Sequence, residues 1–328
     1  MRNPLCHAGT LWMYGAFAGA LITAGALAQS YPLKPIRVIV PTVAGGNPDF
    51  VARPVLQKMA ESLKQAFVFD NRPGAGGIIG VEAAVRSAPD GYTLLFAARG
   101  HVVTPAALQE KLPYDATRDL TGISRLVDAP FALFVHPSLP VRSVRELVAL
   151  AKARPGELTY ASFGVGSSPH FTTEAFSTAT GIRLLHVPYK GSAPAATALL
   201  GGEVMMGFDA LQSTMQHLKT RRLRALAIGA THRVPVAPDI PTFVEAGGPD
   251  LTDSAWYGLF APALAPREVV AKLHAEAVKA LAVIEIRELF ERAGMVVSGS
   301  APEQFTQQVR DDIARYAKIA RDAGMRAE

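Results

Sequence analysis

The chain has 328 residues, of which 49% are hydrophobic and 19% charged, and it contains a single cysteine. This composition is too apolar for a disordered chain, and the length favours two domains over one small core. The 33 Lys and Arg residues outnumber the 28 Asp and Glu residues only slightly and form no basic block, which argues against a nucleic-acid partner.

The first residues have the three parts of a secretory signal peptide. Arg2 is the only charged residue before Lys34, an apolar stretch follows it, and Ala26-Leu27-Ala28 precedes Gln29. We therefore expect residues 1–28 to be a signal peptide that is cleaved near Ala28/Gln29. The alternative is a retained membrane anchor, for which the apolar stretch is barely long enough. After cleavage no cysteine would remain, so the exported chain would be stabilised without disulfides.

The rest of the chain alternates between apolar runs of strand length and longer stretches with helical spacing. Strands are expected at residues 36–40, 66–69, 92–96, 131–135, 158–161, 184–187, 204–208 and 225–228. Helices are expected before residue 63, at 78–87, 144–153, 193–200 and 266–280, and after residues 168 and 300. This alternation with short turns indicates an α/β fold of parallel sheets flanked by helices. We expect two such halves with a ligand cleft between them, at the carboxyl ends of the strands.

The first candidate for ligand binding is the glycine loop Ala44-Gly45-Gly46-Asn47-Pro48-Asp49, directly after a strand. The two glycines allow a sharp turn and leave no side chain in the way of a ligand. Asn47 is expected to cap the following helix, with Pro48 at its first position. The free N–H groups of that helix N-terminus attract anions, which makes the loop a candidate carboxylate site. A plain strand-to-helix turn explains the same residues equally well.

A second glycine loop, Gly164-Val165-Gly166-Ser167-Ser168-Pro169-His170, also lies between a strand and a predicted helix. Its N–H groups, two hydroxyls and imidazole could hold one carboxylate through several hydrogen bonds. For Ser167 and Ser168 the alternative is helix capping, and the two roles are compatible. A nucleophilic serine has less support, because the chain contains no Gly-x-Ser-x-Gly motif.

The third glycine loop, Asn71 to Gly77, superficially suggests a dinucleotide-binding fingerprint. Ile79 occupies the position of the third glycine of that fingerprint, so we favour a structural turn that lets a helix pack closely on the sheet.

Polar residues follow two further predicted strands. Tyr189, Lys190 and Gly191 come after one of them, and Tyr189 and Lys190 could line the cleft. For Lys190 a surface loop is an equally good interpretation. Asp209 ends another strand and could orient Lys190 or a ligand amine.

Arg99 and His101 lie just past a strand end and could add positive charge to the cleft, although solvated loop positions are the default expectation for both. The eight histidines show no His-Glu-x-x-His or other close metal-ligand spacing, so we expect no metal site.

Taken in order, these motifs resemble the substrate-binding proteins of the tripartite tricarboxylate transporter family, the Bug-type periplasmic receptors. The resemblance covers the chain from about Tyr31 to the C-terminus. The residues that carry it are Pro35-x-Arg37-x-Ile39-Val40-Pro41, Ala44-Gly45-Gly46-x-x-Asp49-x-x-Ala52-Arg53, Asn71-Arg72-Pro73-Gly74-Ala75-Gly76-Gly77-x-x-Gly80, Pro89-Asp90-Gly91-Tyr92-Thr93-Leu94-Leu95, Gly164-x-Gly166-Ser167-x-x-His170, Val187-Pro188-Tyr189-Lys190-Gly191, Leu200-Gly201-Gly202, Phe208-Asp209, Pro238-Asp239-Ile240-Pro241-Thr242 and Trp256-Tyr257-Gly258.

The resemblance implies a type II-like, two-domain periplasmic binding protein that closes around a small carboxylate and delivers it to the membrane permease subunits of a tripartite transporter. Residues 29–135 plus 251–328 would form the first domain and residues 136–250 the second. The loops that match residues 44–49 and 164–170 would grip the ligand carboxylate from opposite domains, partly through bridging waters. We expect a monomer that is not an enzyme and needs no cofactor. The candidate ligand-binding residues are Ala44, Gly45, Gly46, Asp49, Gly164, Gly166, Ser167, Ser168, His170, Tyr189, Gly191 and Asp209, with Arg99 and Lys190 as further candidates.

Two other functions are compatible with parts of this pattern. A sensory receptor that presents its ligand to a membrane sensor kinase would use the same closed form. An exported serine hydrolase would use Ser167 or Ser168 with His170, but a helical His two or three residues away is poorly placed to act as the base.

Overall fold

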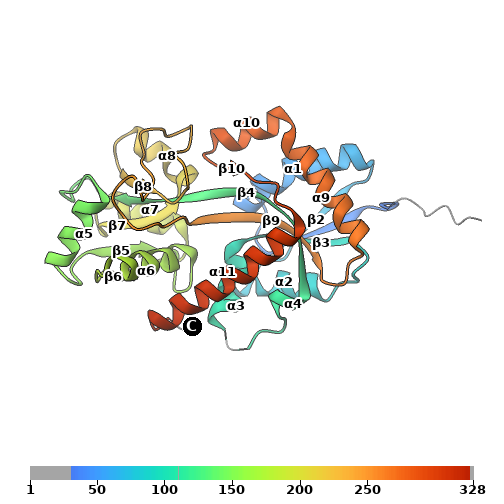
Figure 1. Cartoon of the computed structure of the whole chain (residues 1–328), viewed down its shortest axis with the longest axis horizontal. Coiled ribbons are helices and arrows are strands. Elements are labelled where there is room, and N and C mark those ends of the chain that lie inside the picture. Colours follow the sequence, from blue (N-terminus) through green and yellow to red (C-terminus); the bar gives the residue numbers. More distant parts are fainter. Residues whose placement is uncertain (1–30, 110, 326–328) are drawn as a thin grey trace, which may run out of the picture.

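The computed structural model describes residues 31–109 and 111–325, and the predicted signal peptide lies outside this part. The described strands form one sheet that runs through two lobes, and helices cover both faces of each lobe (Figure 1). The strand order is β2-β1-β3-β9-β4-β7-β5-β6, with β8 and β10 paired to β4 beside this path.

The first lobe is built on the strands next to β1. Its strands are β1 (Ile36–Val40), β2 (Phe67–Asn71), β3 (Thr93–Ala98), β9 (Ser254–Pro262) and β10 (Val296–Val297). β1 pairs in parallel with β2 and β3, whereas β9 is antiparallel to both β3 and β4. Its helices are α1 (Asn47–Leu63), the 3-10 helix η1 (Ala75–Gly77), α2 (Ile78–Val85), α3 (Arg99–Leu108), α4 (Ala116–Asp119), α9 (Arg267–Ala282), α10 (Ile284–Arg292) and α11 (Pro302–Asp322).

The second lobe repeats the plan around β5. Its strands are β5 (Thr159–Ser162), β6 (Leu185–Pro188), β7 (Met206–Ala210) and β8 (Arg224–Ile228). β5 pairs in parallel with β6 and β7, whereas β7 and β8 are antiparallel to β4. Its helices are α5 (Val144–Ala153), α6 (Ser168–Thr180), α7 (Ser192–Gly201) and α8 (Leu211–Lys219).

One long strand, β4 (Leu120–Val135), belongs to both lobes. It pairs with β9 from Leu120 to Pro130 and with β7 from Phe131 to Val135. The sequence pattern predicts a strand over 131–135 and misses the earlier part, because polar residues interrupt the apolar run there. The domain boundaries predicted near residues 135 and 250 stay a prediction.

Both faces of each half of the sheet are buried, as expected for strands with continuous apolar runs. In β1, Val38 packs in one core cluster with Val55 of α1, and Ile39 packs on the opposite face with Val81 of α2. The expected α/β class with helix-flanked sheets is therefore confirmed.

The helix α2, which follows the third glycine loop, packs closely on the end of β1. A methyl group on Gly80 of α2 would lie 2.7 Å from the Pro41 side chain and 2.9 Å from the Arg72 carbonyl oxygen. Only glycine allows α2 to approach the end of β1 this closely.

The C-terminal helix α11 packs against both lobes. Phe305 near its start contacts Trp256 of β9, with ring centroids 5.1 Å apart. Tyr316, nearer its end, packs on Phe171 of α6 in the second lobe, with ring centroids 4.4 Å apart. In Figure 1 this red helix runs from the first lobe toward the second below the sheet.

Candidate ligand-binding site

The first glycine loop follows β1 and is shaped by Asp49, a buried residue of α1. One carboxylate oxygen accepts the Gly45 N–H (2.8 Å) and pairs with Arg53 (3.0 Å), and the other lies 3.4 Å from the amide nitrogen of Asn71. Burial alone would raise the pKa of Asp49, but these hydrogen bonds outweigh it and hold the pKa below its ordinary value. The buried Asp49 carboxylate therefore fixes the conformation of the loop, while Ala44 and Gly45 at the loop tip are exposed.

The predicted cap of α1 is wrong by one residue. Gly46 is the N-cap, Asn47 is the first helical residue, and no side chain caps the first turn. The Asn47 side chain instead lies against the hydroxyl of Tyr257 in β9. The helix N-terminus thus stays uncapped, which leaves it available to an anion.

Several N–H and carbonyl groups of the second glycine loop already form hydrogen bonds with side chains in or beside the loop. The Gly166 N–H donates to His170 Nδ1 (3.1 Å) and the Gly164 N–H donates to Ser162 Oγ (3.2 Å). The Ser167 hydroxyl donates to the Gly164 carbonyl oxygen (2.8 Å). No side chain caps the first turn of α6, which begins at Ser168. The N–H groups of this first turn, more than those of the two glycines, are the donors that this loop offers to a ligand.

A stack of aromatic rings supports this loop from behind. The His170 and His186 rings are 3.9 Å apart, and His186 Nε2 lies 2.6 Å from Ser162 Oγ. Burial, together with the neighbouring His186, lowers the pKa of His170 to about 4, so its imidazole is neutral at pH 7. Sequence reasoning missed Ser162 and His186. Ser162 ends β5 and His186 lies within the adjacent parallel strand β6, and the predicted strands were the available signal.

The geometry gives no support to a serine hydrolase that uses Ser167 with His170. Within the described residues, Ser167 Oγ donates to a backbone carbonyl and His170 Nδ1 accepts a backbone N–H. Neither atom is free for the serine–histidine hydrogen bond that such an enzyme requires.

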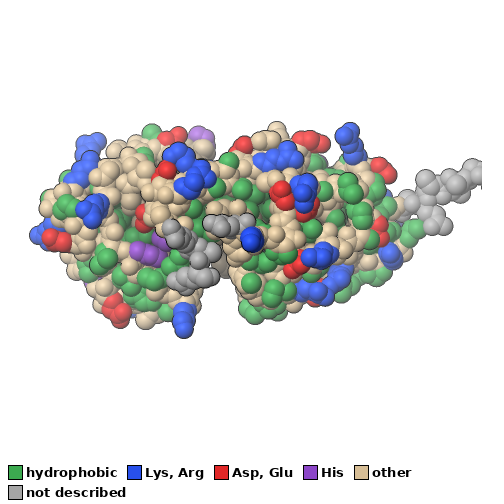
Figure 2. Space-filling model, turned by 90° about the horizontal axis from the view of Figure 1, so that it is seen from below, with side chains coloured by type: hydrophobic (Ala, Val, Ile, Leu, Met, Phe, Trp, Pro, Cys, Tyr) green, Lys and Arg blue, Asp and Glu red, His purple; other side chains and the backbone are tan. Residues whose placement is uncertain are grey.

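A cleft of about 460 Å³ separates the second glycine loop from α3 and η1 of the first lobe. Gly76 and Thr104 line one side, and Gly166 and Ser167 line the other. A methyl group on Gly166 would overlap the Leu108 side chain, which shows how closely the two lobes approach. Figure 2 shows the surface hollowed between the lobes. The first glycine loop does not line this cleft.

The default expectation that Arg99 and His101 lie in a solvated loop is wrong. Both belong to α3, and Arg99 is only 1% exposed, paired with Asp253 and stacked on the Tyr316 ring (4.9 Å). Asp253 also accepts a hydrogen bond from Thr172 of α6. The charge of Arg99 is thus neutralised inside the protein.

His101 carries no charge into the cleft either. Its Nδ1 accepts the N–H of Ala98, and burial lowers its pKa to about 4.

Asp209 lies at the carboxyl end of β7. One of its oxygens accepts the N–H of Ala210 (2.7 Å), and burial raises its pKa to about 7. Burial raises the pKa of the Tyr257 hydroxyl, and the nearby Asp209 carboxyl adds to this rise. The side chain of Asn47, at the edge of the first glycine loop, forms a hydrogen bond with the same hydroxyl. Asn47 and Tyr257 were not among the predicted site residues.

The other predicted residues of the second lobe lie beside the second glycine loop. The Tyr189 N–H donates to the Ser162 carbonyl oxygen (3.0 Å), and a methyl group on Gly164 would lie 3.4 Å from the Tyr189 carbonyl oxygen. Gly191 is the N-cap of α7, with φ +108°. Lys190 is exposed, and no ion pair joins it to Asp209.

Residues 31–109 and 111–325 lack two features that would point to other functions. They contain no group of three or more His, Cys, Asp or Glu residues arranged to hold a metal ion. They also contain no helix that is both long and apolar enough to cross a membrane.

Two α/β lobes that share a strand, with uncapped helix N-termini at the carboxyl ends of the strands, define the class of two-lobed periplasmic binding proteins. Residues 51–325 match the model of the tripartite tricarboxylate transporter family receptor, and the chain belongs to that family.

Known proteins of similar sequence and fold agree with this assignment. Protein BugT of Bordetella pertussis is 36% identical over 308 residues, which cover 94% of each chain. The solved structure of R. palustris Rpa4515 with adipate has a TM-score of 0.78 at 33% identity and covers 90% of this chain and 99% of its own. MatC of Rhodopseudomonas palustris with bound malate has a TM-score of 0.74 at 32% identity and covers 88% of this chain and 99% of its own.

Proposed function

We propose that this chain is a periplasmic receptor that captures a small carboxylated compound between its lobes and hands it to the membrane subunits of a tripartite transporter. The observation that carries the proposal is the pair of uncapped helix N-termini, one in each lobe, at the carboxyl ends of β1 and β5. Each presents first-turn N–H groups and the positive end of a helix dipole, and both features favour a carboxylate.

The connections between the lobes support capture by closure. Strand β4 passes from one half of the sheet to the other at Pro130, and the Asp253 carbonyl oxygen accepts the Phe131 N–H beside it (3.1 Å). A few residues at such a crossing absorb the rotation of hinge closure. In this proposal the receptor binds as a monomer, performs no turnover, and is exported by cleavage near Ala28/Gln29. The relatives with bound adipate and malate are in keeping with a carboxylate as the ligand class.

Thermal unfolding with a panel of acids tests this function. The panel contains mono-, di- and tricarboxylates, aromatic acids and amino acids, and the matched control is the uncharged primary amide of each active acid. A true ligand at a hundredfold excess over its Kd stabilises the folded chain by about 2.7 kcal/mol, whereas its amide has no effect. A flat response across the panel would contradict the proposal.

A further inference from the structure

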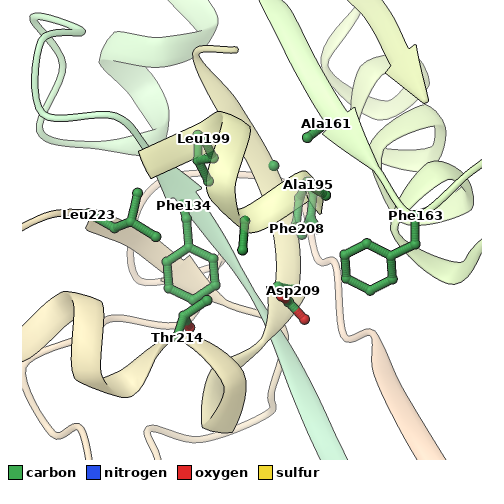
Figure 3. A pocket seen from close by; sticks show the side chains of 11 residues that line it. Phe134, Ala161, Phe163, Ala195, Leu199, Phe208, Asp209, Thr214 and Leu223 are labelled. Atoms are coloured by element: carbon green, nitrogen blue, oxygen red, sulfur yellow. The ribbon is translucent and has the colours of Figure 1, made fainter. Parts of the chain in front are cut away.

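The second glycine loop is held at its β5 end by the core of its own lobe. Phe163 precedes Gly164 and packs against the apolar cluster that contains Phe134 of β4 and Leu199 of α7. Figure 3 shows these side chains around a small cavity inside the second lobe. The other end of the loop, where α6 begins, is placed by different contacts.

Those contacts converge on Asp253, a buried residue directly before β9. Its carboxylate is paired with Arg99, the first residue of α3 in the first lobe. It also accepts a hydrogen bond from the hydroxyl of Thr172, which lies one turn into α6 in the second lobe. Arg315 of α11 lies 3.6 Å from the same carboxylate. One buried side chain therefore connects a helix of the first lobe to the helix that follows the second glycine loop.

The backbone of Asp253 is fixed at the crossing between the lobes. Its carbonyl oxygen accepts the Phe131 N–H (3.1 Å), and its own N–H donates to the Gly229 carbonyl oxygen (3.1 Å). A methyl group on Gly229 would lie 2.7 Å from the Asp253 carbonyl oxygen, so the two segments are in close contact. The carboxylate thus projects from the same crossing that absorbs hinge rotation in the proposed function.

The two helices that Asp253 connects meet beside the cleft. A methyl group on Gly100, in the first turn of α3, would lie 3.5 Å from the hydroxyl oxygen of Ser168, the first residue of α6. Gly100 and Ser167 both line the cleft. The position of the α6 N-terminus relative to α3 therefore sets the shape of the cleft at this point.

We propose, resting on the receptor function above, that Asp253 is a positioning residue for ligand binding. Through Thr172 its carboxylate holds the N-terminus of α6 against the first turn of α3, so that the first-turn N–H groups of α6 are placed for a ligand carboxylate before it arrives. Asp253 does not contact the ligand itself, since it is only 4% exposed. Without the Thr172 hydrogen bond α6 can shift, and ligand binding must then restore its position, which lowers the affinity.

Calorimetric titration of variants of the full chain tests this role. The probes are malate, adipate and the acid that gives the largest thermal shift in the panel above. Thr172→Val removes the hydroxyl, and we expect it to weaken binding of the acids that the wild-type chain binds about tenfold. Thr172→Ser keeps the hydroxyl and should restore the affinity to within about twofold of the wild-type value.

The matched control is Thr173→Val, at the next position of the same helix. Thr173 is as buried as Thr172, but its hydroxyl donates only to the Pro169 carbonyl oxygen (2.7 Å) within α6. Thr172 makes the equivalent contact with the Ser168 carbonyl oxygen (2.9 Å), so the two valine variants differ in the hydrogen bond to Asp253. Thr173→Val should keep the wild-type affinity. Melting temperatures of both variants without ligand separate a loss of fold stability from a loss of binding.

A double variant tests whether Thr172 acts through Asp253. In an Asp253→Ala background, Thr172→Val should cause no further loss of affinity, because the partner of the hydroxyl is already gone. If Asp253→Ala does not fold, the comparison of the Thr172 and Thr173 variants decides alone.

Four results would overturn this role. They are wild-type affinity in Thr172→Val, an equal loss in Thr172→Val and Thr173→Val, no recovery in Thr172→Ser, and the full loss from Thr172→Val in the Asp253→Ala background. Each of these leaves the receptor function standing, because the wild-type chain still binds an acid. Failure of the wild-type chain to bind any acid of the panel would remove the receptor function itself.

Discussion

Arg99 and Asp253 form a buried ion pair where the lobes join. The pair also contacts Thr172 of α6 and the ring of Tyr316 in α11, so three elements of the fold meet at these two charges. Although burial alone would raise the pKa of Asp253, the charge of Arg99 keeps it below its ordinary value. The Asp253 carboxylate thus stabilises the fold at neutral pH, and this contribution is lost as the pH falls below about 4 toward its pKa in the folded state.

Removing one partner of this pair should be costly. Asp253→Ala leaves the Arg99 guanidinium buried without a counter-charge, and we expect a loss of about 3–5 kcal/mol in the free energy of unfolding. Urea titration monitored by circular dichroism measures this loss. The control is Glu288→Ala, which breaks the exposed pair with Arg292 and should cost less than about 1 kcal/mol. Equal losses of unfolding free energy in the two variants would show that the buried pair stabilises the fold no more than an exposed pair does.

At the scale of elements, the second glycine loop and α3 meet across the cleft. Gly166 has φ +74°, and its lack of a side chain lets Leu108 of α3 lie directly against it. The loop is fixed on its own side by the hydrogen bond from the Gly166 N–H to His170. Contact between the lobes at this point therefore depends on the absence of a single methyl group.

Gly166→Ala should hold the lobes apart and weaken binding of the carboxylate about tenfold or more, because the new methyl group displaces Leu108. The matched control is Gly156→Ala, a position with φ +80° and open space around it, which carries the same backbone strain without the contact. Calorimetric titration should show normal affinity for Gly156→Ala and partial recovery in the double variant Gly166→Ala/Leu108→Ala. Wild-type affinity in Gly166→Ala would mean that the lobes do not approach here in the bound state.

At the scale of the whole molecule, few covalent connections join the two lobes. Strand β4 and the segment before β9 cross between them, and α11 packs against both. This arrangement allows one lobe to rotate on the other while each core stays packed, since interiors resist deformation and crossings absorb it.

X-ray scattering of the full chain should show a smaller radius of gyration with a saturating carboxylate ligand than without it. The uncharged amide of the same acid is the control and should leave the radius unchanged. Ligand differentially stabilises the closed form only if it contacts both lobes. An identical radius with and without a ligand that raises the melting temperature would show binding without closure.

Much of the fold follows from local patterns in the sequence. The strand β1 and the helices α1, α5 and α9 lie close to the positions that apolar periodicity predicts, because burial of one face or both imposes that period. The glycine loops follow strands as predicted, since their turns need backbone conformations that glycine adopts without strain. The ordered set of motifs also predicts the family, and the match over residues 51–325 confirms it.

The antiparallel strand β9 and the first part of β4 escaped prediction for a physical reason. Their partners lie far away in sequence, as between Leu120 and Pro262, and polar residues such as Arg125 interrupt the apolar run of β4. When a strand is held by partners that are distant in sequence, the pattern of apolar residues along the chain does not predict it.

The sequence by itself determined the class of fold, the family and the places of the glycine loops between strands and helices, because these depend on short-range periodicity and turn chemistry. Only the tertiary structure decided which charges remain available there. Arg99 meets Asp253 across 154 residues, His170 stacks on His186, and Asp209 stands beside Tyr257. Burial and partners that are distant in sequence set the charge of each of these groups. The residues next to each group in the sequence do not predict its burial or its partners.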